Sequence, residues 1–308
     1  MVYTKVDELI GNTPLMELKN IEKSLGLKAS LFAKLEFLNP TGSAKDRAAL
    51  SILNSAEKNG LIGPGGVVVE ATSGNTGIGL ASVAASRGYK AVIIMPDSMS
   101  KERIKLMQAY GAEVVLSDGS KGMQGSLEKL NEVKEKYPGC FVAGQFVNPA
   151  NAEAHYLTTG PEIFNDLDGM VDTFVAGVGT GGTLSGTGKY LKEKIGSIEI
   201  VAVEPLTSPL LSKGFAGPHG LQGIGANFIP EILDAEIIDR IMCISDEDAY
   251  ECARLIGKQE GLMVGISSGA ALSAAIELCK DEAYANKNIV VLLPDSGDRY
   301  LSTTLFGE

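Results

Sequence analysis

Histidine is scarce in this chain and cysteine is sparse. Only two histidines, His155 and His219, occur among 308 residues, which leaves little material for a histidine-based triad or metal cluster. We expect both to be structural hydrogen-bonding residues, and we predict no metal site. The four cysteines lie in apolar stretches without Cys-x-x-Cys spacing, so reduced buried thiols are expected rather than a zinc site or disulfides. They are Cys140, Cys243, Cys252 and Cys279.

Basic charge and long apolar runs are also in short supply. Lys and Arg total 27 against 38 Asp and Glu, which gives a net charge of −11 and argues against binding to nucleic acid or to an anionic membrane. No apolar run approaches the ~20 residues needed to cross a bilayer. The first residues contain no hydrophobic core of a signal peptide. We therefore expect a cytoplasmic protein with no membrane contact.

Short apolar runs typical of strands alternate with helical patterns along most of the chain. This alternation predicts an α/β fold with mostly parallel, twisted sheets flanked by helices, and at ~150 residues per domain the length suggests two domains. Ligands in such folds collect where strands end and helices begin. We expect strands at 67–70, 91–95, 114–117, 174–176, 198–203 and 289–293, and helices at 78–87, 101–110, 125–136, 184–194, 247–260 and 267–279.

The turn at 39–47 is predicted to place a lysine at the start of a helix. Ser43 is expected to cap this helix, with Asp46 completing a capping box, so Lys45 falls in the first turn. The helix dipole there disfavours the ammonium form and leaves an amine that attacks carbonyls. A solvated surface lysine is the alternative when Lys45 is considered alone.

Two further turns have the composition of anion-binding sites. Residues 72–77 follow a predicted strand and offer hydroxyls, an amide and backbone N–H groups at a helix start, which suits a carboxylate, whereas a plain helix cap needs only one such residue. Residues 177–183 form a Gly- and Thr-rich turn without Lys or Arg, which suits a phosphate monoester.

The second of these turns also fits a rival class of enzyme. It matches the G-x-G-x-x-G pattern, and Glu204 lies 22 residues beyond Gly182 at the end of the next predicted strand. That spacing is typical of a dinucleotide site, so a nicotinamide or flavin enzyme is an alternative. The alternative leaves Lys45 and the turn at 72–77 unexplained. In a fourth turn, Ser267 is either an ordinary helix cap or a neutral partner for a heteroaromatic nitrogen.

Taken together, these motifs resemble the fold-type II pyridoxal-phosphate (PLP) enzymes, and among them the cysteine synthase (O-acetylserine sulfhydrylase) family. Two positions depart from the family pattern: Ala44 stands where Val is usual, and Asn227, near the presumed opening of the site, stands where Gly is usual. The matching segments run in order along essentially the whole chain, at 11–14, 39–47, 72–77, 99–103, 145–149, 158–162, 179–183, 203–205, 222–225, 265–269, 294–297 and 299–302.

The resemblance implies a role for each matching site residue. Lys45 would hold the cofactor as an internal aldimine, Asn75 would bond its ring oxygen and Ser267 would meet its pyridine nitrogen. Its phosphate would be bound by Gly179, Thr180, Gly181, Gly182 and Thr183. The substrate carboxylate would be bound by Gln145 and the turn comprising Thr72, Ser73, Gly74 and Thr76. Gly223 would line the opening.

The resemblance also implies an activity and a domain division. The activity is β-replacement of O-acetyl-L-serine by sulfide, through an aminoacrylate, to give L-cysteine and acetate. A smaller, mobile domain at 41–150 would carry the carboxylate turn, and a larger one at 1–40 and 151–308 the phosphate turn. A homodimer, and binding of the serine acetyltransferase C-terminal tail in a regulatory role, are further implications.

Two related enzymes stay open as alternatives. One is a short bacterial-type cystathionine β-synthase, and the other is a sulfhydrylase that uses phosphoserine. The latter needs an arginine near the carboxylate turn for the extra dianion, and no arginine falls between Arg47 and Arg87.

Overall fold

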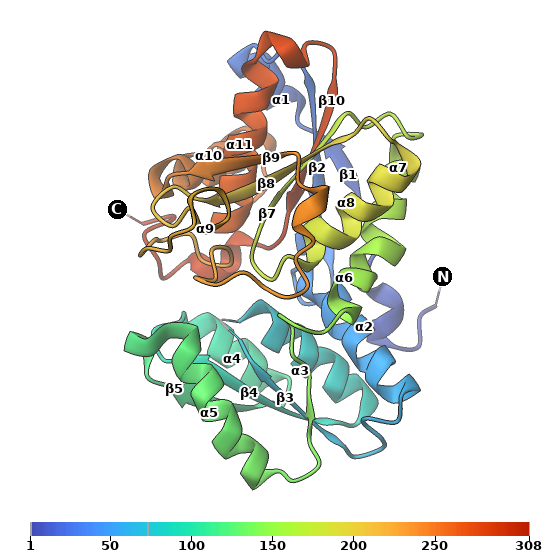
Figure 1. Ribbon diagram of the computed structural model, residues 1–308, viewed down its shortest axis with the longest axis vertical. Helices are drawn as coiled ribbons and strands as arrows, with labels where there is room; N and C mark the ends of the chain where they lie inside the picture. Colours follow the sequence, from blue (N-terminus) through green and yellow to red (C-terminus); the bar gives the residue numbers. More distant parts are fainter. Residues whose placement is uncertain (1, 73, 308) are drawn as a thin grey trace.

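The computed structural model describes residues 2–72 and 74–307, and these form two sheets stacked along the long axis of the molecule (Figure 1). The larger sheet has the strand order β1-β2-β10-β7-β8-β9, with every pair parallel except β1 and β2. Its strands are β1 (Leu15–Glu17), β2 (Ser30–Leu35), β7 (Thr173–Gly177), β8 (Glu199–Pro205), β9 (Arg240–Ile244) and β10 (Asn288–Leu293). The smaller sheet is parallel throughout, in the order β5-β4-β3-β6. Its strands are β3 (Val67–Ala71), β4 (Lys90–Pro96), β5 (Glu113–Ser117) and β6 (Phe141–Val142).

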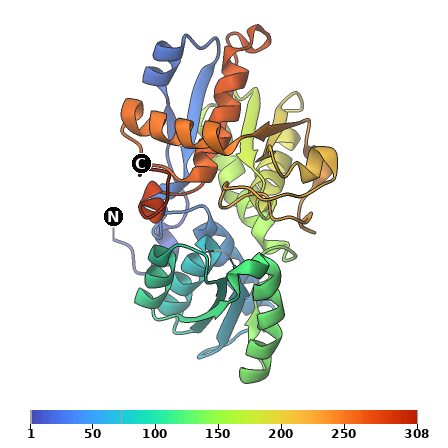
Figure 2. The same ribbon diagram turned by 90° about the vertical axis from the view of Figure 1, so that its left-hand side faces the viewer.

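Helices cover both faces of each sheet, as Figures 1 and 2 show. The α-helices are α1 (Lys19–Leu25), α2 (Lys45–Lys58), α3 (Asn75–Arg87), α4 (Lys101–Ala109), α5 (Gly122–Lys136), α6 (Ala150–Ala154), α7 (Gly160–Asp166), α8 (Gly182–Lys194), α9 (Leu210–Lys213), α10 (Asp246–Glu260) and α11 (Ile266–Lys280). A π-helical turn, η4 (His155–Thr159), joins α6 to α7. Short 3-10 turns are η1 (Val6–Leu9), η2 (Glu36–Leu38), η3 (Gly119–Lys121), η5 (Ala235–Ile237), η6 (Glu282–Tyr284) and η7 (Gly297–Tyr300).

The central strands are apolar on both faces because both faces are buried. In β7, Val175 packs into the core that contains α10 and α11, while Phe174 and Ala176 pack on the opposite side against α8. Successive side chains of a strand point to opposite faces, so a strand covered on both sides needs an unbroken apolar run. In β4, Ile93 and Ile94 divide in the same way between two cores.

The α/β class with mostly parallel, helix-flanked sheets is therefore confirmed. All six strands and all six helices expected from the sequence form, with ends that differ by a few residues. Strands β1, β2, β6 and β9 were not predicted. No helix in residues 2–72 and 74–307 is both long enough and apolar enough to span a membrane. The four cysteines are free, and Cys279 is the one that is fully buried.

The expected capping box at the start of α2 was wrong. The helix begins at Lys45 with Ala44 as its N-cap, and Ser43 Oγ makes only a long contact of 3.3 Å with the Lys45 N–H. Asp46 turns back instead and accepts hydrogen bonds from the backbone N–H (2.7 Å) and the hydroxyl of Thr41. The carboxylate thus fastens the loop before the helix and does not cap the helix itself.

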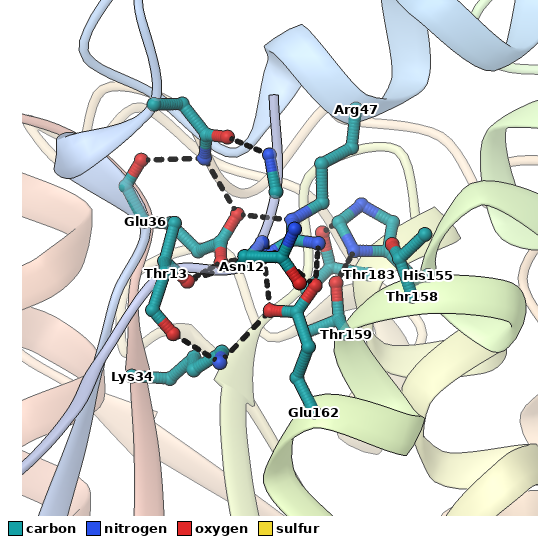
Figure 3. Close-up of polar contacts among 12 residues, drawn as sticks. Asn12, Thr13, Lys34, Glu36, Arg47, His155, Thr158, Thr159, Glu162 and Thr183 are labelled. Atoms are coloured by element: carbon teal, nitrogen blue, oxygen red, sulfur yellow. Dashed lines mark hydrogen bonds and ion pairs between the residues drawn. The ribbon is translucent and has the colours of Figure 1, made fainter. Parts of the chain in front are cut away.

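A buried ionic network fixes α2 against the larger sheet (Figure 3). The Arg47 guanidinium donates to both carboxylate oxygens of Glu36, at 2.8 and 2.7 Å, and to both of Glu162, at 2.6 and 2.7 Å. Lys34 adds an ion pair of 2.9 Å to Glu162. Burial alone would raise the pKa of Glu36, but the charge and hydrogen bonds of Arg47 and the Thr13 hydroxyl lower it to about 2. The network joins α2, η2 and α7.

We predict that Arg47→Met strongly destabilises the protein. The substitution leaves the carboxylate of Glu36 buried without its charge partner, which costs about 3–5 kcal/mol of unfolding free energy. Urea denaturation followed by circular dichroism measures the loss. Arg240→Met is the control, because Arg240 is half exposed in its ion pair with Glu199; an exposed pair contributes about 0–1 kcal/mol. Equal losses for the two variants would contradict the prediction.

Candidate active site

A cavity of about 280 Å³ lies between the two sheets, and most of the predicted site residues line it. Gly182 and Gly74 are not among the lining residues, although each has a neighbour in the sequence that is. Ser73 lies outside the described residues. The predicted residues that line it are Lys45, Thr72, Asn75, Thr76, Gln145, Gly179, Thr180, Gly181, Thr183, Gly223 and Ser267.

Lys45 reaches this cavity from the first position of α2. Its amine makes no hydrogen bond or ion pair with any described residue, although its side chain is largely withdrawn from solvent. Burial lowers the pKa of Lys45, and the charges of Asp295 and Glu36 oppose this effect without cancelling it. Burial and the helix dipole both favour the neutral amine, the form that attacks carbonyl carbon and accepts protons.

The described residues that were predicted to bind the substrate carboxylate lie close together in the structure. The hydroxyl of Thr76, in the first turn of α3, donates to Oε1 of Gln145, and Gln145 Nε2 donates to the carbonyl of Ala71 at 3.3 Å. Thr72 Oγ1 accepts from the N–H of Gly74 at 3.1 Å. Helix α3 begins without a side-chain cap. Its first N–H groups and positive dipole end therefore remain suited to an anion.

Asn75 lines the cavity, but its amide already has protein partners. Nδ2 donates to Asp295 Oδ2 at 2.8 Å, and Oδ1 accepts from Arg299. To donate a hydrogen bond to a cofactor ring oxygen, Asn75 Nδ2 must therefore use its second proton or give up its hydrogen bond to Asp295.

The turn after β7 forms a close-fitting cradle at the start of α8. A Cβ at Gly179 would lie 2.4 Å from the carbonyl oxygen of Gly223, and one at Gly182 would lie 2.3 Å from Asn151 Oδ1. Gly181, the N-cap residue of α8, has a positive φ of 83° and no side chain with which to cap the helix. The backbone at Gly179 and Gly182 thus lies too close to its neighbours for any side chain to fit, and it presents N–H groups at the positive end of the α8 dipole. This donor set fits a phosphate.

Two side chains behind the cradle were not predicted as part of it. Buried His155 lies within hydrogen-bonding distance of Thr183 Oγ1 through Nε2 (3.1 Å) and of Thr159 Oγ1 through Nδ1 (2.8 Å) (Figure 3). Burial lowers the pKa of His155 to about 3, so the ring is neutral at physiological pH. It acts as the expected structural hydrogen-bonding residue. The second side chain, Asn151 on α6, links two parts of the site.

Asn151 Nδ2 donates to the carbonyl of Gln145 at 2.8 Å and to Thr180 Oγ1 at 3.1 Å. A carbonyl oxygen only accepts, so the amide orientation is fixed. Thr180 Oγ1 also receives the N–H of Gly182 at 3.4 Å. With its oxygen accepting twice, the hydroxyl of Thr180 keeps its own proton for a further acceptor, and Thr180 lines the cavity. By donating to Thr180 Oγ1, Asn151 leaves the Thr180 hydroxyl proton available to an anion bound in the cavity.

At the far side of the cavity, Ser267 lies in the first turn of α11 and is buried. A Cβ at Gly223 would come within 3.3 Å of its hydroxyl, so the two predicted residues lie side by side. The charged side chains of the described lining are Lys45 and Arg103, with no Asp or Glu among them. This composition favours anionic ligands despite the acidic chain.

An amine, an anion cradle and a neutral hydroxyl around one cavity are the groups that PLP requires. Residues 6–295 match the family model for pyridoxal-phosphate dependent enzymes, and the chain belongs to this family. The dinucleotide alternative is thereby removed. Within the family, the chain is 52% identical to cysteine synthase of Staphylococcus aureus, over 98% of this chain and 96% of that protein.

Solved structures give the same result. The fold matches cysteine synthase from Entamoeba histolytica with a TM-score of 0.96 and 44% identity, covering 100% of this chain and 92% of the other. It matches a hydrogen sulfide-producing enzyme from Fusobacterium nucleatum with a TM-score of 0.94 and 49% identity, covering 97% and 100%. The expected resemblance, the enzyme class and the PLP cofactor are confirmed.

We predict that Asn151→Ala weakens PLP binding at least fivefold. The variant removes a donor from a buried carbonyl and from the Thr180 hydroxyl, and losing a buried hydrogen bond costs about 1–3 kcal/mol. Titration of the apoprotein with PLP, followed by visible absorbance, measures the change. Asn131→Ala is the control, because Asn131 is exposed on α5. Unchanged affinity in Asn151→Ala would show that the amide does not support the cradle.

Proposed function

We propose that the protein is a cysteine synthase that converts O-acetyl-L-serine and sulfide to L-cysteine and acetate by β-replacement. The observation that carries the proposal is the single cavity that brings the Lys45 amine together with the glycine cradle and with the Thr76–Gln145 pair. The similarity to cysteine synthases over nearly the whole chain supports it.

Within this proposal, each group has one task. Lys45 is the attachment point of PLP. The cradle at 179–183 and the hydroxyls of Thr180 and Thr183 hold the phosphate, and Ser267 meets the ring nitrogen. When bound, PLP supplies an electron sink for the negative charge that develops at the substrate Cα. The Thr72–Thr76 turn and Gln145 hold the substrate carboxylate.

Lys45 also moves the proton. Its amine, whose pKa burial lowers, takes the α-proton of the substrate and later returns it to the same carbon after sulfide has added. The Cβ–O bond breaks with its electron pair on the departing acetate, so no protonated leaving group is needed. A neutral serine at the ring nitrogen stabilises positive charge there less than a carboxylate does, which favours β-elimination over transamination.

Several finer points also belong to the proposal. The division into domains at 41–150 and at 1–40 with 151–308 is supported by the two separate sheets. The homodimer and the cytoplasmic location stay predictions. Binding of a serine acetyltransferase tail is proposed because a turn that holds a substrate carboxylate also suits the terminal carboxylate of a peptide.

The proposal predicts that Lys45→Ala loses the visible absorption above ~400 nm that a covalently attached cofactor gives. It also predicts loss of cysteine formation by at least 10³-fold, because both the attachment point and the proton acceptor are removed. Absorbance spectra and a cysteine assay measure the two effects. Lys258→Ala, at an exposed position on α10, is the control. Full turnover in Lys45→Ala would rule out the assignment.

The substrate is tested with purified enzyme in one product assay. O-acetylserine with sulfide is expected to give cysteine faster than serine with homocysteine gives cystathionine, or phosphoserine with sulfide gives cysteine. A faster reaction with homocysteine would favour the short cystathionine β-synthase alternative.

A further inference from the structure

Arg103 is a buried cation at the cavity without an anionic partner among the described residues. It projects from α4, lines the cavity and is 3% exposed. Nη1 donates to Gln222 Oε1 at 2.7 Å, and the guanidinium lies over the Tyr300 ring at 4.9 Å from its centroid. Within residues 2–72 and 74–307, Nε is buried with no hydrogen-bond partner, and Arg103 forms no ion pair with a carboxylate.

The other buried arginine shows what Arg103 lacks. Arg47 is balanced by the carboxylates of Glu36 and Glu162. Withdrawing an uncompensated charge from water costs several kcal/mol, so buried guanidinium groups are normally paired. An arginine held at a cavity with only a neutral amide and a ring as partners is suited to an anion that arrives with the substrate.

Arg103 also lies against the carboxylate turn. A Cβ at Gly74 would come within 2.3 Å of Arg103 Cδ, so the absence of a side chain there lets the arginine pass. Its hydrogen-bond partner Gln222 precedes Gly223, and both residues line the cavity. No arginine is close to this turn in the sequence. In the fold, helix α4 brings Arg103, which lies 29 residues beyond Gly74, into contact with it.

We propose that Arg103 binds the leaving group of the substrate. It donates to the oxygen atoms of the β-substituent and pairs with the carboxylate that forms as the Cβ–O bond breaks. The electron pair of that bond stays on the acetate oxygen, and the α-proton goes to Lys45. The inference rests on the proposed function and deepens it: the site takes serine derivatives whose leaving group is an oxyanion. A phosphate leaving group has the same chemistry.

The substrate α-carboxylate is the competing partner for Arg103. The second amide proton of Gln145 and the uncapped start of α3 already provide donors for that group. The two assignments differ in one measurable respect. A role at the α-carboxylate affects every amino-acid substrate equally, whereas a role at the leaving group depends on what leaves.

The test compares O-acetylserine with β-chloroalanine in PLP-loaded enzyme. Both have the same α-carboxylate, but chloride is a far weaker base than acetate and needs less stabilisation. The rate of the first half-reaction is read from the change in cofactor absorbance after mixing with substrate alone. In Arg103→Met the rate with O-acetylserine is expected to fall about 10²-fold, the usual effect of removing one charge-stabilising donor. The rate with β-chloroalanine should fall less than tenfold, and Arg103→Lys should recover part of the loss with O-acetylserine.

Equal losses with both substrates, or no loss with either, overturn the assignment. Arg103→Gln keeps the measurement available if Arg103→Met does not fold, and PLP absorbance with thermal unfolding confirms that each variant is intact. Inhibition by sodium acetate gives a second readout, with a tenfold weaker effect expected in the variants. Failure of the unchanged enzyme to turn over O-acetylserine overturns the proposed function itself, whereas failure confined to the variants concerns Arg103 alone.

Discussion

The pairing of Arg47 with Glu36 and Glu162 is the interaction on which the site depends. Arg47 lies two residues after Lys45 on α2, and its guanidinium is bonded to groups of η2 and α7 that belong to the larger sheet and its helices (Figure 3). Helix α2 packs with α3 of the smaller sheet, and the Arg47 side chain links the start of α2 to η2 and α7 of the larger one. Four charged hydrogen bonds, two of them fully buried, therefore hold the helix that carries Lys45 against the larger sheet, whose strand β7 leads into the glycine turn.

Around this fixed point, both sheets bring helix starts to one place. In parallel sheets the strands end at the same edge, where the next helices begin, so β3–α3 and β7–α8 each present free N–H groups there. The two turns face one cavity and are joined through Asn151, which bonds to Gln145 and Thr180. In the proposed function, a substrate carboxylate and a cofactor phosphate would therefore be bound by the same physical means, at two different helices.

The turns could be predicted from the sequence because each is local. Lys45 at a helix start, the residues at 72–77 and the glycine run at 179–183 carry their signal within a few neighbouring positions. Asn151, His155 and Arg103 carry no such signal, because each contacts the site through a partner that is distant in the chain. These partners are Thr180 for Asn151, Thr183 for His155 and Gln222 for Arg103. The Asp46 error has a different origin: a capping box is one local rule, and the carboxylate instead accepts hydrogen bonds from another local partner, Thr41. Strand β1 is three residues long and half-buried, too short for a periodic pattern to mark it.

The contrast between the acidic chain and its cavity has a physical explanation in these residues. A net charge of −11 repels anions at a distance, yet acetate, hydrosulfide and a phosphate all have to enter or leave the proposed site. Backbone dipoles act only within a few ångströms and leave the overall charge unchanged, and carboxylates are missing from the described lining. The two basic side chains of the described lining, Lys45 and Arg103, differ in how firmly they hold their proton. Burial lowers the pKa of Lys45 and so favours the neutral form that acts as a base, whereas Arg103 supplies a guanidinium, which is a cation in proteins. A site that must both remove a proton and release an anion needs one group of each kind.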